Sequence, residues 1–348
     1  MTVHYTRKYM RNKPLIDLED FSQRYLGEWD KRASVRSKER TRLKSEHLSK
    51  SLYLYPLKPF LTHPIVQELG EDQLRKYSFR AAADMLQLVS NFETQLVTDQ
   101  CCKLANHEIG IFLPDSVKQV ALTVGVDEVY HAFTANEFLI DLKNLTGISP
   151  SSIDLNDLLN DSPHPFNPLD ISEFDYFKNN LPNELQRIGE TVLLCIMENS
   201  FTEELFGITK GADLSNPFEA YVREHVIDET RHMNFFRNLL KHIWTSIDEG
   251  KKNILGSVIV SYFDTFHNLN SDSFKQFSEL ELRKFGLDKT LAAQVYSDCT
   301  KYWPPLQKTE MPFLKSRFEL LEFSGILDHE PTRNLLATND WVNTNAYS

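Results

Sequence analysis

The sequence predicts an all-α protein with a four-helix bundle core and additional helices at both ends. From about residue 71 to 268, apolar residues return every three or four positions, which is the period of a helix. Few alternating runs favour a sheet in this stretch. The 348 residues are enough for one large helical domain or two moderate ones.

The first two bundle helices are expected over the first half of this stretch. One covers about residues 71–104 and carries at most one break. The next opens at Asp115 or Ser116, directly after Pro114, and runs to Gly147. Proline before a helix and glycine after it are the residues that the two ends prefer.

A third helix is expected to begin after Pro182 and to end by Gly207 or Gly211. Between the second and third helices, residues 148–182 hold several Pro, Asp, Asn and Ser residues, which predicts a long crossover. A connection of this length is how ferritin-like bundles join their two helix pairs.

The fourth helix has the clearest start in the chain. Asn216 is the expected N-cap, Pro217 takes the first helical position, and Glu219 can reach back to the free backbone amides. The helix should continue to about Ile247.

We therefore divide the chain into three parts. Residues 1–65 form an N-terminal extension that packs on the bundle, 66–270 form the bundle, and 271–348 form a C-terminal helical extension and tail. Helices are expected in that last part over Phe274–Phe285 and Lys289–Tyr302.

Charge and composition exclude several classes of partner. A formal charge of -11 argues against nucleic acid or an anionic membrane, because both select for a basic face. No apolar run approaches the roughly 20 residues that cross a bilayer, and the polar start has no secretory signal. The four cysteines lack the spacing of a metal finger or disulfide framework. Reduced thiols and a cytoplasmic location are expected.

The main chemical signal is the sequence Asp-Glu-x-x-His, which occurs twice. Its copies are Asp127, Glu128 and His131, and Asp228, Glu229 and His232. On a helix, positions i and i+3 point the same way, so each copy presents a carboxylate and an imidazole to one place. A single Glu-x-x-His is usually a surface pair, but these two copies share the preceding Asp.

Both copies fall on apolar stripes. Val124 and Leu139 share a stripe with the first copy, and Tyr221 and Phe236 share one with the second. A carboxylate that faces a bundle core is costly unless it is paired or bound to metal. Two such helices, with one Glu from each of two others, form the ligand set of ferritin-like di-metal carboxylate proteins.

One glutamate in each remaining helix lies on an apolar stripe. Glu93 shares the stripe of Leu86 and Leu96, and Glu198 follows Leu194 by one turn. Both assignments depend on the helix phase, so a neighbouring acid remains an alternative ligand in either helix.

The residues around the motifs have expected roles of their own. A ligating imidazole usually donates its second N–H to an acceptor, and Asp127 and Asp228 can each reach the His of the opposite motif. Solvated aspartates are the alternative. Arg231 neighbours a predicted ligand and can pair with one of these aspartates. His225 stands four residues before Glu229, so it can reach the same metal.

Taken together, this pattern resembles the AurF-like di-iron N-oxygenases, the p-aminobenzoate N-oxygenase family, over about residues 80–245. The matching residues are Glu93, Glu128, His131, Glu198, His225, Glu229 and His232. The resemblance implies that they hold two iron ions, which use O2 to oxidise an amine towards hydroxylamine, nitroso or nitro products in a biosynthetic pathway. It also implies a homodimer. Manganese remains an alternative on ligand type.

The sequence contains no phosphate-binding loop or Cys-x-x-Cys motif, so electrons must come from outside, from a ferredoxin or a flavin reductase. It departs from the family where a benzoate would be held, because no Arg or Lys lies in the turns around Glu93. An amino-acid-derived or carrier-bound amine is equally open.

Three alternatives stand beside this interpretation. A di-iron hydroxylase or desaturase acting on a C–H bond would use the same ligands. A ferroxidase or iron-binding bundle fits the long C-terminal part poorly. A metal-free polar network would leave seven buried polar groups very hard to satisfy.

Overall fold

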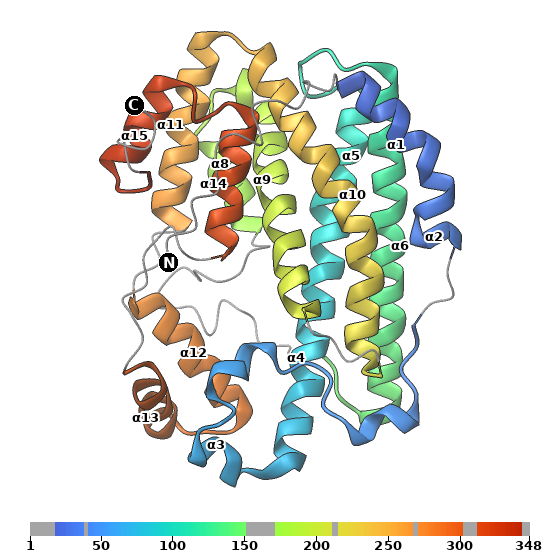
Figure 1. Ribbon diagram of the computed structural model, residues 1–348, viewed down its shortest axis with the longest axis vertical. Coiled ribbons are helices and arrows are strands. Elements are labelled where there is room, and N and C mark those ends of the chain that lie inside the picture. Colours follow the sequence, from blue (N-terminus) through green and yellow to red (C-terminus); the bar gives the residue numbers. More distant parts are fainter. Residues whose placement is uncertain are drawn as a thin grey trace.

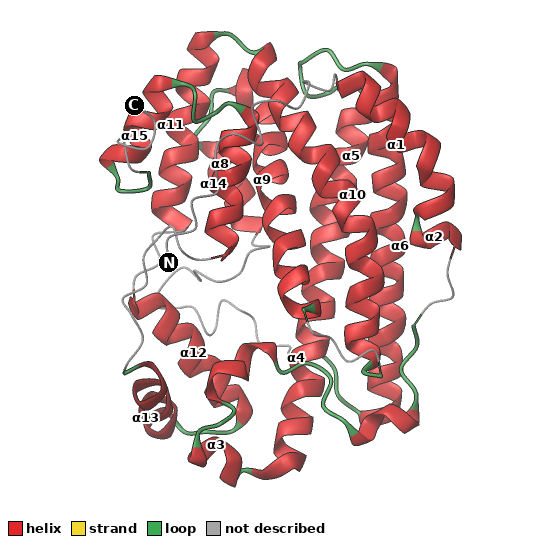
Figure 2. Ribbon diagram, in the orientation of Figure 1, coloured by secondary structure: helices red, strands yellow, loops and turns green. Residues whose placement is uncertain are grey.

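The computed structural model describes residues 18–37, 41–150, 171–210, 215–266, 271–301 and 312–342. Within these ranges every regular element is a helix and there is no strand (Figure 2). The all-α prediction is therefore confirmed. No helix in the same ranges is both long and apolar enough to cross a membrane.

Four long helical segments lie side by side and form the core (Figure 1). Their order along the chain is α4 (Gly70–Phe92) with a π-helical turn (Glu93–Val97) and α5 (Thr98–Ala105), then α6 (Asp115–Thr146), α9 (Asn183–Thr209) and α10 (Pro217–Ser246). The expected bounds hold within a residue or two, and the first segment continues through its π-helical turn without a break.

The ends of α6 and α10 follow from local chemistry. Gly147 ends α6 in the left-handed conformation, at φ 74°, and its N–H donates to the Lys143 carbonyl at 2.8 Å. At the start of α10, the Asn216 side chain accepts hydrogen bonds from the backbone N–H groups of Phe218 and Glu219. Pro217 stands in the first helical position, as predicted.

Further helices pack around the core. On its outer side, α1 (Leu18–Arg32) and α2 (Ser34–Ser37) lie against α6 and α10. The other helices are α3 (Pro64–Glu68), α8 (Ile171–Asn179), α11 (Glu249–Phe266), α12 (Ser271–Phe285), α13 (Lys289–Thr300), α14 (Pro312–Ser324) and α15 (Glu330–Thr338). The two C-terminal helices expected after residue 270 correspond to α12 and α13.

The expected crossover over 148–182 lies largely outside the described residues. Its described end forms α8, which packs against α9 and α11. The proposed division into three parts stays a prediction.

A buried polar network attaches the C-terminal helix α14 to the core. The fully buried Arg317 donates from Nε to the Ser200 hydroxyl at 2.6 Å and from Nη1 to the Tyr262 hydroxyl at 3.1 Å. Tyr262 in turn donates to Glu173 of α8 at 2.6 Å. Because a buried guanidinium needs several acceptors, this network fixes α8, α9, α11 and α14 relative to one another.

Candidate metal centre

All seven candidate ligands are buried among the four core helices. None is more than 4% exposed, and His232 has no exposed surface. They are Glu93 from the π-helical turn, Glu128 and His131 from α6, Glu198 from α9, and His225, Glu229 and His232 from α10. The structure brings six of them into two groups that share Glu229.

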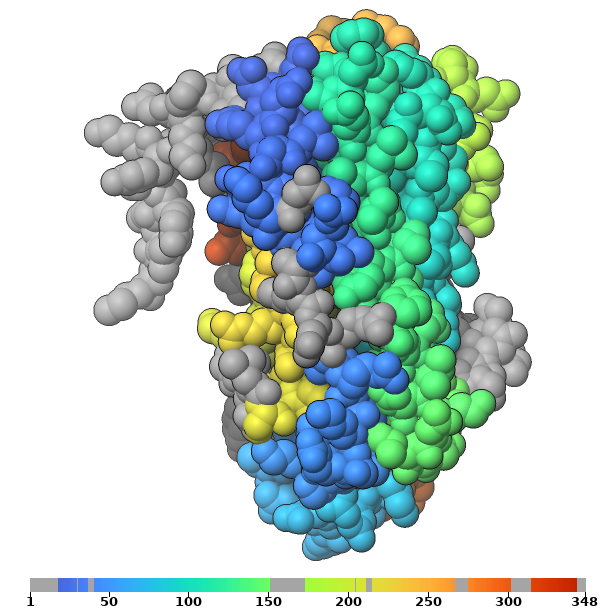
Figure 3. Space-filling view, turned by 90° about the vertical axis from the view of Figure 1, so that its right-hand side faces the viewer, coloured from blue at the N-terminus to red at the C-terminus, as the bar shows by residue number. Residues whose placement is uncertain are grey.

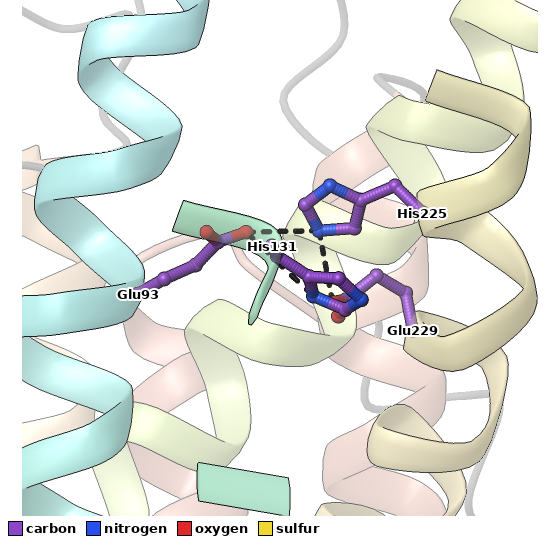
Figure 4. Close-up of side chains that lie close together, drawn as sticks. All are labelled: Glu93, His131, His225 and Glu229. Carbon is purple, nitrogen blue, oxygen red and sulfur yellow. Dashed lines mark hydrogen bonds and ion pairs between the residues drawn. The ribbon is translucent and has the colours of Figure 1, made fainter. Parts of the chain in front are cut away.

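The first group joins three segments of the core. It contains Glu93, His131, His225 and Glu229, whose nearest donor atoms all lie within 4.8 Å of one another. His225 Nε2 lies 2.9 Å from Oε1 of Glu93 and 3.0 Å from Oε1 of Glu229 (Figure 4). His131 turns Nδ1 towards the same Glu229 oxygen, at 3.4 Å.

The second group lies next to the first. It consists of Glu128, Glu229 and His232. His232 Nδ1 lies 2.7 Å from Oε1 of Glu128 and 3.3 Å from Oε1 of Glu229. Since Glu229 belongs to both groups, its carboxylate stands where it could bridge two ions.

Glu198 is the candidate ligand that joins neither group. It is nevertheless 1% exposed, and its Oε2 has no hydrogen-bond partner among the described residues. The nearby carboxylates of Glu229 and Glu128 interact with it electrostatically. Glu198 is therefore beside the second group rather than at ligand distance within it.

The π-helical turn is a feature that the sequence did not reveal. Its extra residue per turn appears in the hydrogen bond from the Thr98 N–H to the Glu93 carbonyl, five residues back. Such turns are frequent at functional sites, because they reorient side chains within a helix. Here the turn begins at Glu93, the only candidate ligand of its segment.

Each aspartate of the repeated motif contacts the histidine of the other copy. Asp228 Oδ2 lies 3.1 Å from Nε2 of His131, and Asp127 Oδ2 lies 3.2 Å from Nε2 of His232. Both aspartates have no exposed surface. With Nε2 directed at an aspartate, each ring presents Nδ1 to the carboxylates of the cluster, which is the orientation that a ligating imidazole needs.

The same aspartates receive hydrogen bonds from two residues that the sequence gave no reason to select, and from Arg231, which the sequence did select. Trp29 Nε1 lies 3.0 Å from both oxygens of Asp127, although the two residues are 98 positions apart. The Ser34 backbone N–H donates to Asp228 at 3.1 Å. Arg231 pairs with Asp228 and lies 3.2 Å from Asp127.

Burial and the mixed charges change the proton affinities of the cluster. Burial raises the pKa of Glu93 to about 7, although His225 and His131 act in the opposite direction. Burial, with the negative charge of Glu229, also raises the pKa of Glu198 well above its usual value. For Glu229, the three histidines outweigh burial and hold its pKa well below the usual value.

For the histidines, the nearby carboxylates raise the pKa values against the effect of burial. Burial alone would lower the pKa of His131, but hydrogen bonds with Asp228 and Glu128 outweigh it and raise this pKa well above the usual value. The pKa of His232 is likewise raised, against the effect of burial, chiefly by Glu128. In the absence of metal, protons on these rings therefore balance part of the carboxylate charge.

The donor atoms of the cluster are satisfied better by bound metal ions than by one another. The Oε2 atoms of Glu93 and Glu229 lack hydrogen-bond partners among the described residues, as does Oε2 of Glu198. Buried anionic oxygens without partners are costly, and a divalent cation satisfies several at once. The two groups could hold one metal ion each, with carboxylate and imidazole donors that suit iron or manganese.

No protein-family model matches this chain, and no curated protein is significantly similar to it. What the structure shows is an all-helical protein with two adjoining buried Glu/His clusters that could form a di-metal site.

Proposed function

We propose that this protein is a non-haem di-iron oxygenase that uses O2 to N-oxygenate an amine. One observation carries the proposal: a third histidine, His225, lies within 3.0 Å of two carboxylates of the first group. Paired Glu-x-x-His helices alone are common to many di-metal bundles. The additional imidazole is the feature that the sequence shares with the N-oxygenase family it resembles.

The residues have separable tasks in this proposal. Glu229 would bridge the two ions, Glu93, His131 and His225 would hold one of them, and Glu128 and His232 would hold the other. Glu198 stands beside the second group, and its Oε2, which has no hydrogen-bond partner among the described residues, could be a further donor. Asp127 and Asp228 keep the proton on Nε2 of His232 and His131, so that Nδ1 remains a donor for metal.

Bound iron would supply the redox chemistry. The first oxidation balances as R–NH2 + O2 + 2 H⁺ + 2 e⁻ giving R–NHOH + H2O, and the two electrons would come from a ferredoxin or flavin reductase. Water must be kept from a reactive oxidant, and the complete burial of the cluster provides this exclusion.

The surroundings of His225 favour an organic substrate over an inorganic ion. The rings of Phe201 and Tyr221 both stand edge-on to His225, with centroids 6.0 Å away. Phe92 packs on Phe201 at 5.6 Å. Aromatic side chains beside the proposed ions suit an apolar group, whereas a ferroxidase needs a polar path for hydrated iron.

Iron loading and oxygen exposure test the proposal. The metal-free protein is loaded anaerobically with ferrous iron, desalted, analysed for iron and then mixed with O2 while its visible spectrum is recorded. We expect about two irons per chain and a transient absorption that decays faster with an arylamine or an amino-acid amine, giving a hydroxylamine or nitro product.

Two variants of α10 sharpen the result. His225→Gln should lower the iron content. His242→Gln should not, because His242 lies on the same helix but its ring hydrogen-bonds the Phe112 carbonyl, away from both groups. One zinc or no metal would refute the di-iron assignment. Two irons with oxidation only at a C–H bond would refute N-oxygenation and leave a hydroxylase.

A further inference from the structure

The hydroxyl of Tyr221 in α10 is a buried polar group without a partner. Tyr221 is 6% exposed, and its Oη has no hydrogen-bond partner among the described residues. Other buried tyrosines are satisfied. Tyr77 donates to Glu281 at 2.5 Å, and Tyr262 donates to Glu173 at 2.6 Å. A buried hydroxyl usually finds a partner, because leaving it unpaired costs the free energy of its desolvation. The Tyr221 hydroxyl therefore points to a partner that the chain itself does not supply.

Tyr221 stands next to the candidate metal centre. It precedes His225 by one helix turn, and the centroids of the two rings are 6.0 Å apart at an interplanar angle of 86°. Burial, and then the negative charge of Glu93, raise the pKa of Tyr221 well above its usual value. The hydroxyl therefore keeps its proton and lies close to the first group.

The neighbours of this hydroxyl leave its oxygen without a donor. Thr134 of α6 lies close to it, but the Thr134 hydroxyl donates to the His131 carbonyl at 2.9 Å. Thr134 can thus accept the Tyr221 proton but has no proton left to donate to the Tyr221 oxygen. The rings of Phe138 and Phe218, at 5.9 and 6.4 Å from the Tyr221 ring, are fully buried and apolar.

A surface cavity reaches the same turn of α10 from outside. It has a volume of about 510 Å³ and is lined by Ser215, Pro217 and Ala220, together with side chains from residues 41–50. Figure 3 shows the start of α10, in yellow, beside that segment, in blue. Ala220 directly precedes Tyr221, so a cavity large enough for a small organic molecule adjoins the turn that carries the buried hydroxyl.

We propose that Tyr221 binds the amine group of the substrate, with its hydroxyl oxygen accepting an N–H of that amine. The proposal rests on the N-oxygenase function and names the residue that orients its substrate. An amine is oxidised at its nitrogen lone pair, so it has to be held through its N–H groups, by an acceptor. The Tyr221 oxygen is such an acceptor, and Thr134 can accept its proton. The lone pair then stays available to the metal centre.

The carboxylates of the first group are less suited to this task. Glu93 and Glu229 are candidate metal ligands, so their oxygens are needed elsewhere. Their negative charge would also favour the protonated amine, which has no lone pair to oxidise. A neutral phenol does not favour the ammonium form, so Tyr221 selects an unprotonated amine.

Amine binding in the absence of O2 tests the proposal. Aniline is the probe, because it is unprotonated at neutral pH, and N,N-dimethylaniline, which has no N–H, is its matched control. In calorimetric titrations of the anaerobic iron-loaded protein, Tyr221→Phe should weaken the binding of aniline about tenfold and leave that of N,N-dimethylaniline unchanged. A wild-type protein that does not bind aniline, an unchanged affinity for it, or an equal loss for both amines would overturn the proposal.

The stability of the metal-free protein separates a binding role from a structural one. Tyr221→Phe removes a hydroxyl without a partner, so its urea midpoint should be no lower than that of the wild type. Tyr77→Phe removes a hydroxyl that donates to Glu281, so it should lower the midpoint and leave the affinity for aniline unchanged. A midpoint for Tyr221→Phe as low as that of Tyr77→Phe would mean that the hydroxyl is structural, and would overturn the proposal.

The two proposals can fail separately, because the binding test requires no oxidation. A wild-type protein that binds aniline through Tyr221 but forms no hydroxylamine with O2 would refute N-oxygenation and support the amine site. Hydroxylamine formation with the same KM in the wild type and in Tyr221→Phe would support N-oxygenation and refute the role of Tyr221.

Discussion

Replacing Glu93 by glutamine should stabilise the metal-free protein at alkaline pH while weakening its metal site. Glu93 is 1% exposed, and its main partner is His225 at 2.9 Å. Burial raises its pKa from the ordinary value of 4.5 to about 7. The folded protein therefore holds this proton more tightly than the unfolded chain does.

The sign and size of the effect follow from that difference. Below pH 4.5 the Glu93 carboxyl is protonated in both the folded and the unfolded state, so its ionisation does not lower the free energy of unfolding. As the pH rises towards about 7, only the unfolded chain releases the proton, so the free energy of unfolding falls. A difference of about 2.5 units corresponds to about 3 kcal/mol, fully present above pH 8.

Urea unfolding of the metal-free protein at several pH values measures this cost. Glutamine has the same shape and no charge, so Glu93→Gln should be about 3 kcal/mol more stable than the wild type at pH 8 and nearly equal to it at pH 4.5. Glu108→Gln, at an exposed position, controls for the general effect of removing a negative charge.

The metal content of the same variant completes the test. The site loses one oxygen donor of the first group, so iron affinity should fall while stability rises. Identical pH profiles for the wild type and Glu93→Gln would refute the reasoning, as would a variant that is less stable at pH 8. Either result would mean that Glu93 is not held as a costly buried acid.

Three further predictions concern other parts of the molecule. Glu229→Ala removes the residue common to both groups, so iron analysis should fall from about two ions per chain to nearly none. Asp127→Asn changes the acceptor of the His232 Nε2 proton and should weaken iron binding about 10- to 100-fold in a chelator competition. Gly147→Ala places a side chain at φ 74° with open space around it, and should lower the free energy of unfolding by about 1 kcal/mol in urea.

The core helices could be predicted from the sequence because their ends are encoded locally. Asn216 and Pro217 start α10, and Gly147 ends α6, through contacts with residues at most four positions away. The same holds for the repeated motif, since positions i and i+3 share a helix face wherever that helix is placed. Glu128 and His232 come together only if α6 and α10 pack against each other, and the apolar stripes of the two helices indicate that they do.

Other parts of the site depend on contacts that no local pattern records. The hydrogen bond of Trp29 to Asp127 joins residues 98 positions apart, and that of Ser34 to Asp228 joins residues 194 positions apart. The π-helical turn at Glu93 also has no proline or glycine to mark it. The periodicity placed Glu198 on an inward stripe, yet a phase argument is too coarse to decide whether it reaches ligand distance.

The N-terminal helices α1 and α2 support the candidate metal centre through hydrogen bonds, although they supply none of the candidate ligands. Burial alone would raise the pKa of Asp228. Its hydrogen bonds with His131 and with the Ser34 N–H outweigh burial and hold this pKa well below the usual value. Asp127 has Trp29 and Arg231 as donors. The Asp228 carboxylate therefore stays ionised without metal, whereas the oxygens of Glu93, Glu198 and Glu229 that lack partners among the described residues still require a cation. Loss of α1 and α2 would leave Asp127 and Asp228 with fewer donors, and the histidines that they orient would lose their fixed direction.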